Sequence, residues 1–162
     1  MIDVINLKKS FGSHDVLNGI DITINKGDIV VVIGPSGSGK STFLRCLNCM
    51  EDPTGGQIIF NDVDIADPHV DINVHRRHMG MVFQHFNLFN NKTVLENIML
   101  APVHVRCKGL HGAKRKEEVK KIREQAMALL ARINMQDKAD VYPSTLSGGQ
   151  KQRLSIALAE MN

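Results

Sequence analysis

The opening residues alternate between apolar and polar positions, which is the pattern of half-buried β-strands. The alternation runs through residues 2–7 and returns in 20–24, and the Gly-Ser-His-Asp sequence at 12–15 favours a turn between them. An uninterrupted β-branched run at 29–33 follows a second turn and is typical of a strand buried on both faces. The pattern therefore predicts a small antiparallel sheet first and a central parallel strand after it.

Helical spacing replaces the strand pattern after residue 42. The apolar positions within 43–50 fit one face of a helix, and short apolar runs at 57–60 and 79–83 predict two further strands. The central strand thus runs into a glycine-rich loop and then into a helix. This order of elements predicts an α/β fold.

Helices dominate the second half of the sequence. Thr93, with Glu96 three residues later, forms a capping-box pattern, so we expect a helix that begins after Thr93 and ends before Pro102. One continuous apolar stripe predicts the longest helix at 114–133. A last helix follows a Ser-Gly-Gly turn and carries residues 156–161.

The composition indicates one domain with a sizeable core. Of 162 residues, 43% are apolar and 23% are charged. No apolar run approaches the roughly 20 residues that a membrane-spanning helix needs. The formal charge of +3 comes from 20 basic and 17 acidic residues, so no nucleic-acid partner is expected from composition. Three cysteines without a secretory pattern favour free thiols in a reducing compartment.

Residues 34–42 carry the strongest functional motif. The sequence Gly-Pro-Ser-Gly-Ser-Gly-Lys-Ser satisfies the P-loop pattern, between a predicted strand and a predicted helix. Its glycines let backbone N–H groups converge on phosphate oxygens, while Lys40 would contact the β- and γ-phosphates and Ser41 would bind Mg²⁺. The motif predicts a site for a nucleoside triphosphate with Mg²⁺. Its residues are Gly34, Pro35, Ser36, Gly37, Ser38, Gly39, Lys40, Ser41 and Thr42.

A second motif, at residues 146–150, again places backbone amides and a hydroxyl at the start of a helix. The sequence there is Leu-Ser-Gly-Gly-Gln, and together with the P-loop it resembles the ATP-binding-cassette (ABC) family, whose signature motif it matches completely. The resemblance implies ATP as the ligand and a head-to-tail dimer, in which one subunit's signature closes over the other's ATP. A helix cap without a ligand is the alternative. The residues implied to act in trans are Leu146, Ser147, Gly148, Gly149 and Gln150.

Other positions match the family's pattern one by one. Phe11, with Val16 beyond it, has the spacing of the adenine-stacking loop, so the resemblance implies that Phe11 stacks on the base. The alternative is a strand-end aromatic in the small core. Gln84 matches the glutamine of the Q-loop, which is implied to bind Mg²⁺ together with Ser41. The implied fold is a P-loop core with a β subdomain over about 1–84, a helical subdomain over about 85–150, and a return to the core at 151–162.

Three longer stretches, at 42–48, 82–89 and 93–98, resemble the ATPase subunits of polar amino acid importers. In such importers the segment after the Q-loop grips a short helix of the membrane permease. The resemblance therefore implies that Phe86 to Asn97 is the docking surface, on the cytoplasmic face of the bacterial inner membrane. A soluble ABC ATPase of DNA repair or translation is the alternative.

The resemblance also implies a strand ending in Asp-Glu after the signature helix, and later a switch histidine, and the 162 residues hold none of these. We therefore expect impaired hydrolysis, an incomplete core sheet with uncovered apolar surface, and poor stability of these residues alone. A non-hydrolysing nucleotide-binding partner is a further alternative.

Weaker patterns are better explained as structure. Cys46 and Cys49 have the spacing of half a zinc site, but no second cysteine pair exists and both fall on the helix after the P-loop. The basic residues within 114–123 alternate with glutamates on a helix, so a solvated face is favoured over a phosphate-backbone footprint.

Overall fold

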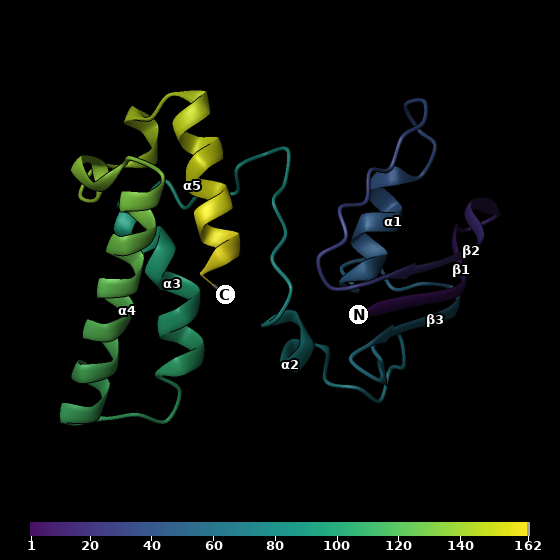
Figure 1. Ribbon diagram of the computed structural model, residues 1–162, viewed down its shortest axis with the longest axis horizontal. Helices are drawn as coiled ribbons and strands as arrows, with labels where there is room; N and C mark the ends of the chain where they lie inside the picture. Colours follow the sequence, from purple (N-terminus) through teal and green to yellow (C-terminus); the bar gives the residue numbers. More distant parts are fainter. Residues whose placement is uncertain (162) are drawn as a thin grey trace. The chain divides into compact units, whose positions relative to one another are not determined.

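The computed structural model describes residues 1–161, and residue 162 lies outside the described part. The chain forms two compact units, Met1–His78 and Met79–Asn162 (Figure 1). The first unit contains β1 (Ile2–Phe11), β2 (His14–Ile24), α1 (Lys40–Leu47), β3 (Gly55–Phe60), β4 (Val63–Asp64) and α2 (Ile72–Arg76). The second contains α3 (Val94–Arg106), α4 (Gly112–Arg132), two short 3₁₀ turns, η1 (Gln136–Lys138) and η2 (Pro143–Thr145), and α5 (Gly148–Glu160). No helix among residues 1–161 is long and apolar enough to cross a bilayer.

The first unit is built on a four-stranded sheet with the order β2-β1-β3-β4. Every pair of neighbouring strands is antiparallel, so the small antiparallel sheet predicted at the start of the chain is confirmed. Phe11 pairs with His14 where β1 turns into β2. The buried side of the unit also receives Phe43 and Cys46 from α1, which contacts β2.

A bulge at Asn6 decides which side chains of β1 are buried. Asn6 has a φ of 47°, its N–H donates to the Asp21 carboxylate at 2.7 Å, and the register shifts between Val4 and Leu7. Strict alternation would send Val4 and Leu7 to opposite faces, and the extra residue in the bulge brings them to the same one. As a result Val4, Leu7 and Lys9 are all buried.

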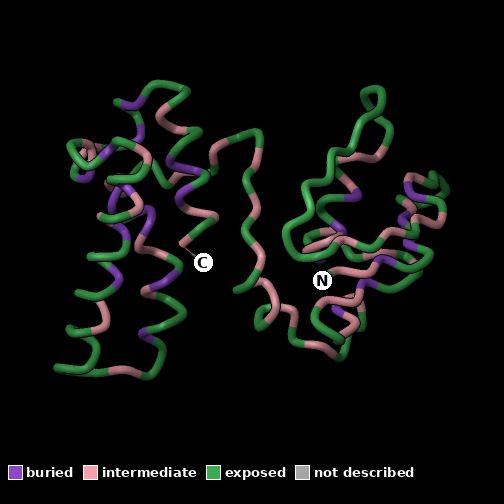
Figure 2. Tube along the Cα trace, in the orientation of Figure 1, coloured by how far each residue is buried: buried purple, intermediate pink, exposed green. Residues whose placement is uncertain are grey.

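Residues 29–33 do not form the predicted central strand. The sheet contains none of them, and Ile29, Val31 and Ile33 are 92%, 76% and 86% exposed. Figure 2 shows the stretch 28–38 exposed throughout. A strand buried on both faces needs hydrogen-bonded neighbours, and no described strand pairs with this run. The predicted strand is therefore wrong for the described residues, whereas the expected uncovered apolar surface is confirmed.

Residues 79–83 also lie outside the sheet, so the strand predicted there is wrong. The segment instead runs close beside α5. A Cβ atom on Gly80 would lie 2.5 Å from the Ala159 carbonyl oxygen, and the Ser155 hydroxyl donates to the Phe86 carbonyl at 3.0 Å. The segment therefore contacts a helix, and no strand among the described residues pairs with it.

The core of the second unit lies between α3, α4 and α5 (Figure 1). The stripe predicted for the longest helix supplies Ile122, Ala126 and Leu130, which are all buried. Figure 2 shows buried positions recurring along each of these helices. The buried core residues are Val94, Leu95, Ile98, Ala126, Leu130, Met135, Ala139, Leu146, Leu154 and Ala157.

Helix α3 begins where the capping box predicts and ends later than expected. The Thr93 side chain accepts from the Glu96 N–H, and the Glu96 side chain accepts from the Thr93 N–H. However, α3 passes through Pro102 and ends at Arg106, so the predicted end before Pro102 is wrong. An interior proline removes one helical hydrogen bond and crowds the preceding turn, but Pro102 is buried in this unit and α3 continues through it.

Candidate nucleotide-binding site

The P-loop meets the N-terminus of α1. Gly39 is the N-cap residue, and no side chain caps the helix and no acidic residue lies in its first turn. The first turn of a helix carries N–H groups without intrahelical partners and a partial positive charge. Within the described residues, these N–H groups therefore lack the side-chain acceptor found at the N-termini of α3 and α5. The arrangement suits an anion.

Gly39 brings the P-loop against β2. Its φ is 83°, a conformation that favours glycine, and a Cβ atom there would lie 3.0 Å from the Val16 side chain and 3.1 Å from the Leu17 side chain. Only glycine meets both requirements without displacing β2. The structure thereby brings Val16, a predicted nucleotide contact, next to the P-loop.

The Lys40 ammonium lies within the loop that precedes it. Its Nζ donates to the carbonyl oxygens of Gly34 at 2.9 Å and Pro35 at 2.7 Å, and to the Ser38 hydroxyl at 3.4 Å. An ammonium has three donors, so all three are used by the loop. A phosphate oxygen would replace one of these neutral acceptors with a negatively charged one.

Phe11 lies at the end of β1 and is 48% exposed. This exposure places the ring outside the core, so the alternative of a core aromatic is wrong. The Nζ atom of Lys9 lies over the ring, 4.7 Å from its centroid. One side of the ring is therefore covered by a cation, and much of the rest remains accessible.

The signature motif forms the N-terminus of α5. Ser147 and Gln150 make a reciprocal capping box, in which the Ser147 hydroxyl accepts from the Gln150 N–H at 3.3 Å and the Gln150 side chain accepts from the Ser147 N–H at 2.8 Å. Leu146 is only 6% exposed and packs in the core. Leu146 therefore has a structural role in this unit, and the action of the signature motif in trans stays a prediction.

The backbone conformation and the surroundings of Gly148 and Gly149 would both accept a residue with a side chain. Neither has a positive φ, and a Cβ atom on either would meet nothing within 4 Å. Both lie in the first turn of α5. Glycine is about 1 kcal/mol less favourable than alanine inside a helix.

Gln84 is exposed and lies at an open hollow in the second unit. The hollow has a volume of about 260 Å³ and is lined by Gln84, His85, Phe86, Asn87, Leu88, Asn90, Pro143 and Lys151. Ser41 belongs to the first unit and Gln84 to the second. The Mg²⁺ site that the two were predicted to share therefore stays a prediction.

Residues 17–162 match the family model described as ABC transporter. The chain belongs to the ABC transporter family. This result agrees with the resemblance inferred from the P-loop and the signature.

Two relatives in the family carry names of amino acid transport. The arginine transport ATP-binding protein ArtM of Bacillus subtilis (strain 168) is 52% identical over 98% of this chain, and the match covers 62% of the relative. The glutamine transport ATP-binding protein GlnQ of Geobacillus stearothermophilus is 47% identical over 97% of this chain and is covered over 61% of its length. The chain thus spans about three fifths of the length of these relatives.

A solved ABC cassette has the same fold. The dimeric structure of the ATP-binding cassette MJ0796, in a post-hydrolysis state bound to ADP and Pi, aligns with a TM-score of 0.80 and 32% identity. The alignment covers all of this chain and 70% of that one. The α/β fold class and the cassette assignment are therefore confirmed.

Part of the segment predicted to dock a permease is buried. Val94, Leu95 and Asn97 belong to the interior, so these three side chains are not available to a partner, and a docking role for the rest of Phe86 to Asn97 stays a prediction. Asn97 is 2% exposed, and its side chain bonds to the backbone of Phe89, Lys92 and Thr93. It fixes the loop beside the hollow and does not face a partner.

The sequence analysis did not predict the burial of two residues near the candidate sites. Lys9 is buried beside Phe11, and the alternation of Leu7 and Lys9 on one face of β1 was the signal that would have found it. Asn97 gave no such signal, because its four bonds depend on how the preceding loop folds back.

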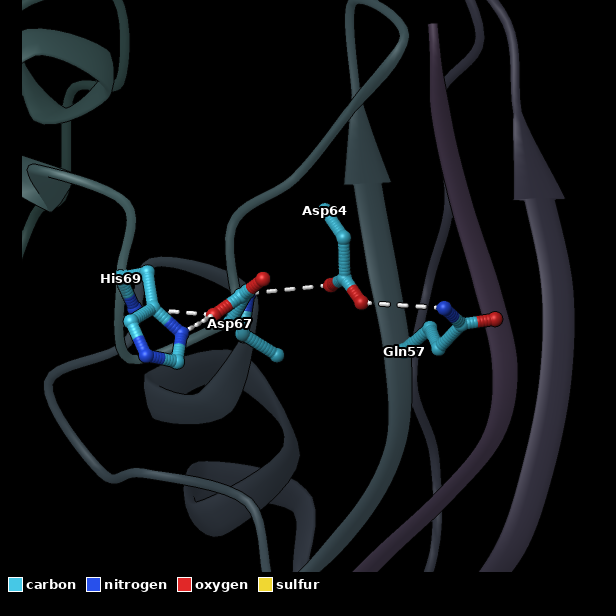
Figure 3. Close-up of polar contacts among 5 residues, drawn as sticks. Gln57, Asp64, Asp67 and His69 are labelled. Atoms are coloured by element: carbon cyan, nitrogen blue, oxygen red, sulfur yellow. Dashed lines mark hydrogen bonds and ion pairs between the residues drawn. The ribbon is translucent and has the colours of Figure 1, made fainter.

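The histidines and cysteines form no metal site among residues 1–161. In Figure 3, Asp67 accepts hydrogen bonds from the His69 backbone and ring, while Asp64 bonds to Gln57. The His69 backbone N–H is the main cause that lowers the pKa of Asp67.

The three cysteines are free and buried, and burial raises the pKa of Cys49 to about 11.

Proposed function

We propose that this chain is the MgATP-binding subunit of an importer for polar amino acids. In this proposal ATP bound at the P-loop of one subunit is closed over by the signature helix of a second subunit. The movement drives a separate membrane permease. The subunit would work at the cytoplasmic face of the membrane, as a peripheral protein.

The observation that carries the proposal is the pair of glycines at the start of α5. Gly148 and Gly149 lie in a helical turn where alanine would fit and would stabilise the helix. No atom of the described residues lies within 4 Å of where their Cβ atoms would be, so the described part of the chain does not explain glycine here. A nucleotide bound to a second subunit would explain it, because phosphate can approach a helix backbone that has no side chains closely.

The P-loop residues are proposed to hold the triphosphate. Lys40 and the N–H groups of the first turn of α1 would neutralise the β- and γ-phosphates. Ser41 is exposed at that turn, which fits a Mg²⁺ ligand. Mg²⁺ would supply charge neutralisation between the phosphates. Phe11 and Val16 would contact the base, and Gln84 would reach the ion from the second unit.

The hollow beside Gln84 supports the docking part of the proposal. Its wall combines apolar side chains, Phe86, Leu88 and Pro143, with the polar groups of His85 and Lys151. Such a mixture suits a short amphipathic helix from a permease. The transport names of the relatives favour this partner over a nucleic acid.

Two variants distinguish ATP binding from ATP-dependent dimer formation. In the wild-type chain, we expect MgATP to bind and to promote dimers in sedimentation velocity. Lys40→Ala should weaken ATP binding at least about ten-fold, because it removes charge-assisted hydrogen bonds. Gly148→Ala should keep ATP binding at its own P-loop and lose the ATP-dependent dimer, while its thermal stability is equal or higher.

Gln152→Ala serves as the matched control, since Gln152 is exposed on the same helix. It should leave both binding and association unchanged. An ATP-dependent dimer in Gly148→Ala equal to that of the wild type would contradict the role of the signature. Phosphate release is followed in the same samples, and steady turnover by these 162 residues would contradict the expectation of impaired hydrolysis.

A further inference from the structure

Lys9 is a charged side chain in the interior of the first unit. It is 9% exposed, its Nζ donates to the Asp52 carbonyl oxygen at 2.7 Å, and the Glu51 carboxylate lies 3.6 Å away. Lysine is rarely buried unless it is paired, because removing an ammonium from water is costly. Here both partners come from the turn that follows α1.

The same ammonium touches the predicted base-stacking ring. It lies over Phe11 at 4.7 Å from the ring centroid, within the distance of roughly 6 Å at which cation–π attraction is significant. With the cation over the ring, the Phe11 residue is still about half exposed.

The turn that holds Lys9 is anchored on the helix of the phosphate site. The N–H groups of Met50 and Glu51 both donate to the Arg45 carbonyl oxygen, at 2.9 and 3.3 Å. Arg45 lies in the last turn of α1, and α1 begins at Lys40. One buried cation therefore connects the Phe11 ring to the helix whose first turn forms the P-loop site.

We infer that Lys9 is a positioning residue that holds the Phe11 ring ready to stack on the adenine of ATP. This inference rests on the proposed function. The cation restricts the ring before the nucleotide arrives, so less side-chain freedom is lost on binding. It also draws ring electron density to the covered side, which favours an electron-rich purine on the open side.

The test compares a ligand that has a base with one that does not. Dissociation constants for MgATP and for magnesium tripolyphosphate are measured for the wild type and for Lys9→Met, which keeps the chain length and removes the charge. Lys9→Met should weaken ATP binding about two- to five-fold and leave tripolyphosphate binding unchanged. Lys9→Arg, which restores a cation, should recover ATP binding. Lys8→Met is the control, because Lys8 is the exposed neighbour on the same strand.

The variant Phe11→Leu tests whether Lys9 acts on ATP binding through the aromatic ring. There, Lys9→Met should have no further effect on ATP binding. An equal loss for both ligands, or a loss that persists without the ring, would overturn the inference and leave the proposed function intact. Absence of ATP binding by the wild type would overturn both. If Lys9→Met does not fold at the assay temperature, Lys9→Gln, which keeps a hydrogen-bond donor without the charge, carries the same expectation.

Discussion

At the scale of single residues, Asn97 shows how one buried amide can fix a surface loop. Its oxygen accepts from the Phe89 N–H at 2.8 Å, and its NH₂ nitrogen, which carries two hydrogens, lies 2.8 to 3.1 Å from three backbone carbonyl oxygens that those hydrogens can reach. All of these groups belong to the loop that enters α3. The loop that borders the proposed docking hollow is therefore held from inside the core.

Replacing Asn97 should destabilise the second unit. Asn97→Ala removes the side-chain partner of the part-buried Phe89 N–H and of the Lys92 carbonyl, so we expect a loss of about 2 to 4 kcal/mol in the free energy of unfolding. Urea unfolding measures it through the fluorescence of Tyr142, the single tyrosine of the chain, which lies in the same unit. Asn91→Ala, at an exposed neighbouring position, should change the free energy little. Equal stability of the two variants would contradict the assigned role.

At the scale of elements, the N-termini of the long helices differ in their caps. Helices α3 and α5 carry complete capping boxes, while α1 has neither a side-chain cap nor an acidic first turn. A capping carboxylate on α1 would compete with phosphate for the same N–H groups. Helix α4 also lacks a side-chain cap and an acidic first turn, and what distinguishes α1 is the P-loop that precedes it.

The cap of α3 gives a stability that depends on pH. The hydrogen bond from the Thr93 N–H is the main cause that lowers the pKa of Glu96. A carboxyl group whose pKa is lowered by folding stabilises the folded state at pH values above its ordinary pKa. This stabilisation is lost as the pH falls through the lower pKa of the folded state. The difference in unfolding free energy between the wild type and Glu96→Gln should therefore shrink from about pH 6 to about pH 3.

Thr93→Val provides the companion measurement. It removes the capping hydroxyl while keeping the shape of the side chain, and should cost about 1 kcal/mol at neutral pH. Thr93→Ser, which retains the hydroxyl, should cost much less. A pH-independent difference for Glu96→Gln would show that the carboxylate charge plays no part in the cap.

At the scale of the whole molecule, the second unit offers a hollow of about 260 Å³ at the segment that the importer resemblance assigned to docking. Asn90 lines this hollow and is exposed, so a larger side chain there can fill it without entering the core. The hollow is therefore testable separately from the nucleotide site.

Filling the hollow should block permease docking and spare ATP binding. For Asn90→Trp, we expect loss of co-purification with the cognate membrane subunits and loss of amino acid uptake, with an unchanged dissociation constant for ATP. Asn91→Trp is the matched control, because Asn91 is also exposed and is not among the residues that line the hollow. Normal uptake with Asn90→Trp would place the docking surface elsewhere.

The sequence alone determined the features whose bonds are local. The P-loop, the capping box at Thr93, the signature turn at Ser147 and the hairpin after Phe11 each involve residues within a few positions of one another. Short-range geometry and residue type are enough to specify such bonds. The family itself was recognisable from two of these motifs.

Only the tertiary structure decided the features that depend on distant partners. The run 29–33 has the composition of a buried strand, yet it is exposed because no described strand pairs with it. The bulge at Asn6 decides that Lys9 is buried beside Phe11. The fold of the loop that enters α3 decides that Asn97 faces inward. Burial and pairing depend on what the rest of the chain places nearby, and a local pattern does not contain that information.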